Sequence, residues 1–350
     1  MGHLNTIQPE HRGIPKQAKV IAVSSGKGGV GKSSISLSLA VELSAHNNKV
    51  CVFDADTNLA NINIMTGLNP LHTLHDYLVK KLSIDDILIE GPAGISIIPS
   101  ASGMVDLVNF DQKKQKSLLG LIQQLESQFD YILVDTSAGI TESVLGFVKG
   151  AAQTIIIITP EPTSLTDAFS LLKVLKQSGF DRSFQVLVNR VKNFKEAKEV
   201  IFRFAKAVNK YLDLKVVSPG YIYEDRNVPR SIMAQKPFSV IYPRSSASHC
   251  LRNIARKIEQ GEVSRVKAFS EYLSEEVSLK VETDNPLELQ SDLDKVLASL
   301  HDYPVNEVEQ FLSMASQQWL KKIEAESFEE QYFESDGYKA AIKFASKLKP

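Results

Sequence analysis

A glycine-rich stretch at residues 26–33 limits the possible folds of this chain more than any other feature. It reads Gly-Lys-Gly-Gly-Val-Gly-Lys-Ser and lies between an apolar run at residues 20–23 and a helix-like run at residues 34–43. A strand, a loop of spacing G-x-x-x-x-G-K-S and a helix, in that order, form a phosphate-binding loop. The glycines let backbone N–H groups turn toward phosphate oxygens, and the helix presents its positive N-terminal end. We therefore expect nucleotide phosphates to bind at Gly26, Lys27, Gly28, Gly29, Val30, Gly31, Lys32, Ser33 and Ser34.

The loop contains two lysines with different expected roles. Lys32 can reach the outer phosphates of a nucleotide, and the Ser33 hydroxyl can ligate Mg²⁺. A phosphate-binding loop needs only one such lysine, so Lys27 would crowd its own loop and is better placed to act elsewhere.

Carboxylates follow two of the strand-like runs. Asp54 and Asp56 come after residues 50–53, and Asp135 comes after residues 131–134. In a parallel sheet these strand ends share one edge with the phosphate-binding loop. Mg²⁺ bound through few protein groups, phosphates and water needs carboxylates there, so we predict a metal shell of Ser33, Asp135 and Asp54. A turn or cap residue is the alternative interpretation of each aspartate.

Strand-like and helix-like runs alternate through residues 18–260. This alternation is typical of a doubly wound α/β fold, with a mostly parallel sheet and helices on both faces. The predicted strands lie at residues 20–23, 50–53, 95–98, 131–134, 154–159, 184–188 and 215–217, and helices include residues 112–128, 165–177 and 195–211.

The composition of the chain changes near Gly261. The first 260 residues contain 30 basic and 23 acidic side chains, whereas residues 261–350 contain 10 basic and 18 acidic ones and look helical throughout. We expect a polar N-terminal arm at residues 1–17, an α/β domain at residues 18–260 and an acidic helical appendage at residues 261–350.

The end of the appendage, residues 337–350, has the pattern of a basic amphipathic helix. Three lysines fill one arc of the helix, and apolar side chains that include Ile342 and Phe344 fill the opposite arc. This pattern suits weak attachment to an anionic membrane surface. A helix packed against the appendage has the same pattern.

Several classes of protein are disfavoured. Apolar runs such as residues 155–158 are too short to cross a bilayer, and no apolar signal core begins the chain, so we expect a cytoplasmic location. The two cysteines, Cys51 and Cys250, form no C-x-x-C pair, which argues against an iron–sulfur carrier.

The phosphate-binding loop, with its early lysine, resembles the deviant Walker A box of MinD/ParA-class ATPases. The resemblance implies ATP and Mg²⁺ as ligands and a homodimer in which Lys27 reaches the partner's ATP. It also implies that Asp56 orients or activates the attacking water, while Lys27 and Lys32 offset the developing negative charge. Gly139 would relay the state of the γ-phosphate, and Asn189 would contact adenine. A strand-terminal turn is the alternative interpretation of Asn189.

Four further segments resemble the FlhG/FleN flagellar-number regulators, a YlxH-like family. These segments are residues 54–61, 99–103, 161–168 and 243–248. The resemblance covers about residues 18–258 and implies control of flagellar number or placement. The implied partners are an FlhF-like GTPase, a flagellar transcription activator or basal-body proteins, at the inner face of the cell membrane or the cell pole.

The chain departs from that family in two places. The arm at residues 1–17 lacks a DQAxxLR-like motif, and the acidic helical appendage at residues 261–350 is longer than expected. It also departs from the MinD/ParA class, because an expected loop at residues 221–225 has Tyr223 where that class usually has proline.

Two other functions fit the same residues. A ParA/MinD-type ATPase for DNA partition or division-site positioning is one, although we predict no specific nucleic-acid partner. A scaffold that binds nucleotide only as a switch, without hydrolysis, is the other.

Overall fold

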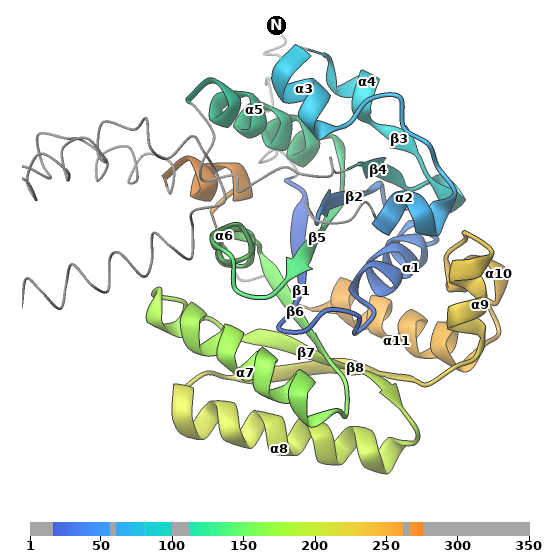
Figure 1. Ribbon diagram of the computed structural model, residues 1–350, viewed down its shortest axis with the longest axis vertical. Coiled ribbons are helices and arrows are strands. Elements are labelled where there is room, and N and C mark those ends of the chain that lie inside the picture. Colours follow the sequence, from blue (N-terminus) through green and yellow to red (C-terminus); the bar gives the residue numbers. More distant parts are fainter. Residues whose placement is uncertain (1–16, 57–60, 81, 100–111, 262–266, 276–350) are drawn as a thin grey trace, which may run out of the picture. The chain divides into compact units, whose positions relative to one another are not determined.

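The computed structural model describes residues 17–56, 61–80, 82–99, 112–261 and 267–275 (Figure 1). In this part of the chain, eight strands form one sheet in the order β3-β4-β2-β5-β1-β6-β7-β8. All neighbouring strands are parallel except β3 and β4, which are antiparallel. The predicted α/β fold with a mostly parallel sheet is therefore confirmed.

The strands are β1 (Lys19–Ser25), β2 (Val50–Ala55), β3 (Ile89–Glu90), β4 (Ser96–Ile98), β5 (Tyr131–Ala138), β6 (Gln153–Ile158), β7 (Phe184–Val191) and β8 (Val216–Tyr223). The helices are α1 (Lys32–Ser44), α2 (Asn61–Thr66), α3 (Leu74–Lys80), α4 (Ile84–Ile87), α5 (Gln112–Gln128), α6 (Glu142–Gly150), α7 (Pro162–Gln177), α8 (Phe194–Leu212), α9 (Asn227–Met233), α10 (Phe238–Ile241) and α11 (Ser246–Gln260). A 3₁₀ turn lies at Pro92–Gly94.

Helices cover both faces of the sheet because the central strands are apolar on both sides. Along β1, Val20 and Ala22 belong to one core cluster with residues of α5, α6, α7 and α8. Ile21 and Val23 belong to the other cluster, with residues of α1, α10 and α11. Successive side chains of a strand point to opposite faces, so a parallel strand buried on both faces needs a continuous apolar run. The run at residues 20–23 supplied that signal in the sequence.

Strand β8 extends further than the sequence predicted. The expected loop at residues 221–225 is wrong in its first half, because Tyr221–Tyr223 continue β8 and pair with β7. Pro219 interrupts the sequence pattern, but β8 lies at the edge of the sheet, where a missing backbone donor is tolerated. The hydroxyl of Ser218 also donates to the Val186 carbonyl at 3.0 Å, which compensates for the irregular pairing.

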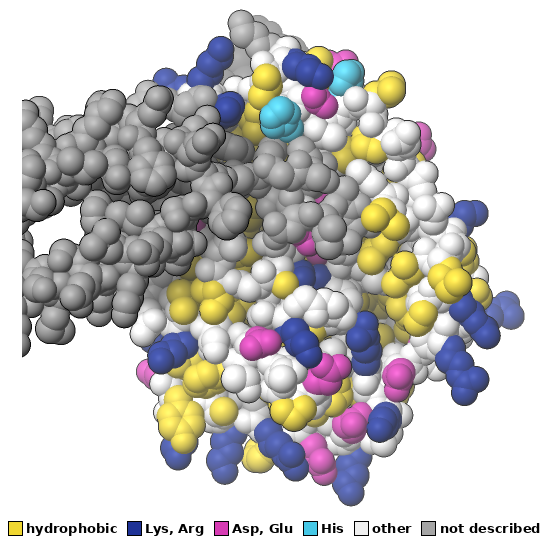
Figure 2. Space-filling view, in the orientation of Figure 1, with side chains coloured by type: hydrophobic (Ala, Val, Ile, Leu, Met, Phe, Trp, Pro, Cys, Tyr) yellow, Lys and Arg dark blue, Asp and Glu magenta, His cyan; other side chains and the backbone are white. Residues whose placement is uncertain are grey.

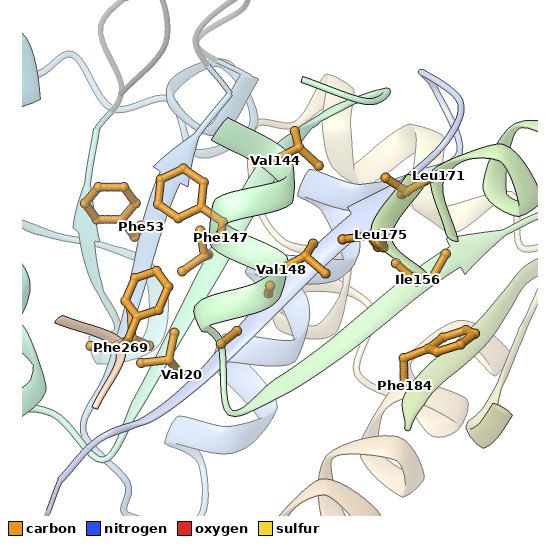
Figure 3. Close-up of a cluster of buried hydrophobic side chains, with 14 of the residues drawn as sticks. Val20, Phe53, Val144, Phe147, Val148, Ile156, Leu171, Leu175, Phe184 and Phe269 are labelled. Carbon is orange, nitrogen blue, oxygen red and sulfur yellow. The ribbon is translucent and has the colours of Figure 1, made fainter. Parts of the chain in front are cut away.

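The described chain continues beyond the predicted boundary at Gly261. Helical residues 269–275 pack on the α5–α6 side of the sheet, where Phe269 joins the hydrophobic core. The ring of buried Phe269 stacks on Phe147 at a centroid distance of 6.0 Å, and Phe147 also contacts Phe53 at 6.1 Å (Figure 3). The two carboxylate oxygens of buried Glu126 accept hydrogen bonds from the first two amides of this helical segment.

The N-terminal arm and most of the appendage, including residues 337–350, lie outside the described residues, and their predicted roles stay predictions. Among the helices that are described, none has the length and apolar character needed to span a bilayer.

We expect Phe269→Ala to destabilise the protein by about 3 kcal/mol, because it removes a fully packed ring and leaves a cavity beside Phe147. Urea denaturation followed by circular dichroism measures the change. The matched control is Phe202→Ala, since Phe202 is 66% exposed, and its effect should stay within about 0.5 kcal/mol. Equal stabilities of the two variants would contradict the structural role of Phe269.

Candidate functional site

The predicted phosphate-binding loop connects β1 to α1 near the centre of the sheet, where β1 lies between β5 and β6. Gly31, the residue before α1, has a left-handed backbone with φ of 102°. A Cβ at this position would also lie 2.6 Å from the side-chain nitrogen of Asn189. Both the conformation and the close approach therefore require glycine.

Helix α7 packs directly against the beginning of the loop. A Cβ on Gly26 would lie 2.1 Å from the carbonyl carbon of Asp167, which belongs to the backbone of α7. The Ser25 hydroxyl donates to the Lys27 carbonyl at 2.8 Å and fixes the first turn of the loop. The path of the loop thus depends on a helix about 140 residues further along the chain.

Lys32 and Asp135 bring opposite charges together in a buried environment. Lys32 is 7% exposed and Asp135 is fully buried. Burial lowers the pKa of Lys32, whereas the charges of Asp135 and Asp56 oppose that shift. Burial raises the pKa of Asp135 to about 6, against the hydrogen bond from Ser33 and the charge of Lys32. Each charge makes the burial of the other less costly.

The three predicted aspartates lie at the same edge of the sheet. Asp54 of β2 and Asp135 of β5 are register partners on neighbouring parallel strands. The Asp56 amide donates to Asp54 Oδ1 at 3.1 Å, so the chain turns tightly after β2. The influence of Asp56 on the pKa of Lys32 places both groups in one electrostatic environment.

These residues fit a Mg²⁺ ion that is bound together with nucleotide. Asp135 Oδ1 accepts a hydrogen bond from Ser36 at 2.9 Å, whereas Asp135 Oδ2 is buried without a hydrogen-bond partner among the described residues. An acceptor of this kind can bind a water of a magnesium shell. Within the described ranges, no group of three or more His, Cys, Asp or Glu side chains could bind a metal alone. Mg²⁺, which binds through few protein groups plus phosphate and water, suits that arrangement.

Lys27 lies apart from this buried group. Its ammonium donates to Glu161 Oε2 at 2.7 Å and to Thr163 Oγ1 at 2.8 Å, both at the N-terminus of α7. The side chain is 35% exposed, in contrast to that of Lys32. The two lysines of one loop therefore differ in burial and in partners, as the sequence suggested.

Asn189 contacts the phosphate-binding loop itself. Its side-chain nitrogen donates to the Val30 carbonyl at 2.8 Å, and its Oδ1 accepts from the Arg190 amide at 2.9 Å. Arg190 has a positive φ of 59°, and the register between β7 and β8 shifts between Val188 and Val191. This geometry places Asn189 beside the loop, and its contact with adenine stays a prediction.

Strand β5 connects the metal edge to the base of the loop. The Thr136 hydroxyl donates to the Val23 carbonyl at 3.1 Å, and the Gly139 amide donates to the Ser25 carbonyl at 3.1 Å. Gly139 has φ of 104°. These two hydrogen bonds join the end of β5 to the last part of β1, from which the phosphate-binding loop begins.

Sequence reasoning missed three residues of this site. Ser36 binds Asp135, and Glu161 and Thr163 bind Lys27. Ser36 follows the loop by one helical turn from Lys32, so helical spacing could have indicated it. No local signal linked Glu161 or Thr163 to a lysine more than 130 residues earlier.

A family model described as ParA, NUBPL iron-transfer P-loop NTPase matches residues 16–259. The chain belongs to the MinD/ParA family of P-loop ATPases. Its resemblance to that family, predicted from residues 26–33, is thereby confirmed. The chain has no C-x-x-C pair, and Cys51 is buried.

Two curated relatives are similar to this MinD/ParA-family chain over most of their length. Antiactivator FleN of Pseudomonas aeruginosa is 34% identical over 69% of this chain and 86% of FleN. Flagellum site-determining protein YlxH of Helicobacter pylori is 32% identical over 69% of this chain and 84% of YlxH. Among solved structures, MinD of Pyrococcus horikoshii with Mg-ADP has a TM-score of 0.55 and 23% identity, over 71% of this chain and all of MinD. That structural likeness shows the shared fold.

The raised pKa of Asp135 predicts that the stability of the nucleotide-free protein depends on pH. The ordinary value is 3.8, so protonation favours the folded state, and this stabilisation is lost as pH rises from about 4 through about 6. Asp135→Asn should therefore lack this loss, so its stability relative to the parent should rise by roughly 2–3 kcal/mol between pH 4 and pH 8. Denaturant midpoints across this pH range measure the effect.

The matched control for this experiment is Asp85→Asn, which makes the same substitution at an exposed position. A stability difference between Asp135→Asn and the parent that is the same at pH 4 and pH 8 would contradict the raised pKa of Asp135.

Proposed function

We propose that this chain is a MinD-like switch that binds Mg-ATP, forms a homodimer through the bound nucleotide and hydrolyses it slowly. The observation that carries the proposal is the difference in burial between the two lysines of the phosphate-binding loop. Lys32 is only 7% exposed, where it would bind phosphates of its own nucleotide, whereas the Lys27 side chain is 35% exposed, where a second copy could reach it.

The chemistry proposed for the site follows from phosphoryl transfer, which depends mainly on positioning and on charge stabilisation. Ser33, Asp135 and Asp54 would bind Mg²⁺, which would neutralise charge on the phosphates. Asp56 would orient the attacking water, because its carboxylate lies at the same sheet edge as Lys32. Lys32 and the partner's Lys27 would then stabilise the charge that develops during transfer.

The regulation of flagellar number or placement is the cellular role that we propose. It is supported by the similarity to FleN and YlxH, whose names describe an antiactivator and a flagellum site-determining protein. Partition of DNA by a ParA-type mechanism would be favoured by a strongly basic surface. On the face shown in Figure 2, Lys and Arg side chains over α7 and α8 are interspersed with Asp and Glu.

The first test concerns dimerisation. With hydrolysis blocked by Asp56→Ala, ATP should convert the monomer to a dimer in light scattering, and ADP should not. Adding Lys27→Ala should restore the monomer, because the cation that reaches the second nucleotide is gone. A mass that ATP leaves unchanged in the Asp56→Ala protein would rule out this mode of pairing.

The second test separates binding from hydrolysis. Lys32→Ala should lose tight ATP binding, since a buried phosphate contact is removed, whereas Asp56→Ala should retain ATP and lose at least 100-fold in turnover, a loss of about the size expected for a group that positions water. Calorimetry and phosphate release measure the two effects. Parent-like turnover in Asp56→Ala would refute the role of Asp56, and absence of turnover in the parent would favour the scaffold.

The third test addresses the cellular role. Replacing the native gene with one that encodes Lys32→Ala should change the number or position of flagella per cell, counted by electron microscopy, because the switch can no longer bind ATP. Cells with normal flagella but altered division sites or DNA segregation would support the alternative role instead.

A further inference from the structure

The contact between Lys27 and α7 is more specific than a surface lysine requires. The ammonium of Lys27 has three donors, and two of them bind Glu161 and Thr163 at 2.7 and 2.8 Å. Both distances are typical of hydrogen bonds from a charged donor, and both acceptors lie at the N-terminus of α7. The contact joins a loop near the start of the chain to residues 134 and 136 positions later.

The local electrostatics make Glu161 the essential member of this contact. The N-terminus of a helix carries partial positive charge and disfavours a nearby cation. Glu161 is the N-cap residue of α7, but its side chain makes no capping hydrogen bond. The carboxylate instead accepts from Lys27, and this hydrogen bond is the main reason that the pKa of Glu161 is lowered. The carboxylate thus stays ionised at neutral pH and offsets the charge of the helix terminus.

The same helix fixes the backbone of the loop. Gly26 packs on the α7 backbone at Asp167, and Ser25 binds the Lys27 carbonyl. The backbone at Lys27 is therefore held in place, so a change of partner would require movement of the Lys27 side chain alone.

We propose that Glu161 and Thr163 are positioning residues that keep the Lys27 ammonium on its own subunit and so oppose ATP-dependent pairing. This inference rests on the proposed function, in which Lys27 acts on the nucleotide of a second copy. In the dimer, Lys27 would exchange the carboxylate for phosphate oxygens. Glu161 opposes this exchange twice, because it attracts Lys27 and repels the anionic phosphates of the approaching nucleotide.

The expected effect is moderate for each subunit and larger for the dimer. A single exposed ion pair changes an equilibrium by about 1.4-fold to fivefold. Two copies of the contact break in each dimer, so the factors multiply. Removing the pair should therefore lower the dimer Kd by about twofold to 30-fold.

The experiment compares dimer Kd values at saturating Mg-ATP in the Asp56→Ala background, measured by analytical ultracentrifugation. Glu161→Gln should tighten the dimer by the factor above, and Thr163→Val should tighten it less because it removes a neutral acceptor. Thr163→Ser retains the hydroxyl and should behave like the parent. Glu199→Gln is the matched control, since Glu199 is similarly exposed and lies 3.9 Å from Arg203 on α8.

A second measurement detects the contact without nucleotide or pairing. Acetylation of the nucleotide-free protein, followed by mass spectrometry, should be about 1.4-fold to fivefold faster at Lys27 in Glu161→Gln than in the parent. The rate at exposed Lys49 should be the same in both proteins and serves as the internal reference.

The two measurements separate the possible failures. A weaker dimer in Glu161→Gln would overturn the proposal, because Glu161 would then support pairing. Unchanged acetylation of Lys27 would also overturn it. Failure of every variant to dimerise would overturn the proposed function, and with it the exchange of Glu161 for phosphate oxygens by Lys27. Faster acetylation would still support the restraint on Lys27 in the monomer.

Discussion

The burial of two opposite charges, Lys32 and Asp135, is the constraint on which the rest of the site depends. Both groups lost contact with water when the chain folded, and burial favours the neutral form of each. It lowers the pKa of Lys32 and raises the pKa of Asp135. The sheet makes this possible by placing β5 beside β1, so that a carboxylate at the end of one strand faces the helix that follows the other. A bound nucleotide with Mg²⁺ would balance these charges further, because its phosphates would lie near Lys32 and the metal ion near Asp135.

The sequence was most informative where local pattern and long-range order coincide. The run at residues 20–23, the glycine spacing of the loop and the helical pattern after it all predicted one strand, loop and helix unit, which the structure contains. Asp54 and Asp135 could be placed at one sheet edge because parallel strands bring their carboxyl ends together. Their proximity therefore followed from topology, without knowledge of any side-chain contact.

The contacts that could not be predicted join residues distant in sequence through side-chain geometry. The hydrogen bonds from Lys27 to α7 depend on the packing of Gly26 against that helix, which no periodicity encodes. The contact of Phe269 with Phe147 was hidden because charge composition suggested a boundary near Gly261. The second half of β8 was missed because Pro219 and Gly220 are typical of turns, although an edge strand tolerates both.

The different burial of the two loop lysines also explains why Lys32 would stay in place while Lys27 would change partners in the proposed function. Lys32 sits where water is excluded, so moving it would leave Asp135 as an uncompensated buried charge, and such a loss is costly. Lys27 is solvated, and exchanging one exposed partner for another changes the free energy little. In the proposed dimer, the phosphates of a second nucleotide would overcome a weak restraint on Lys27, while the restraint on Lys32 would persist. The loop would then bind nucleotide firmly and still respond to a second copy of the chain, because these two tasks would belong to lysines in different dielectric environments.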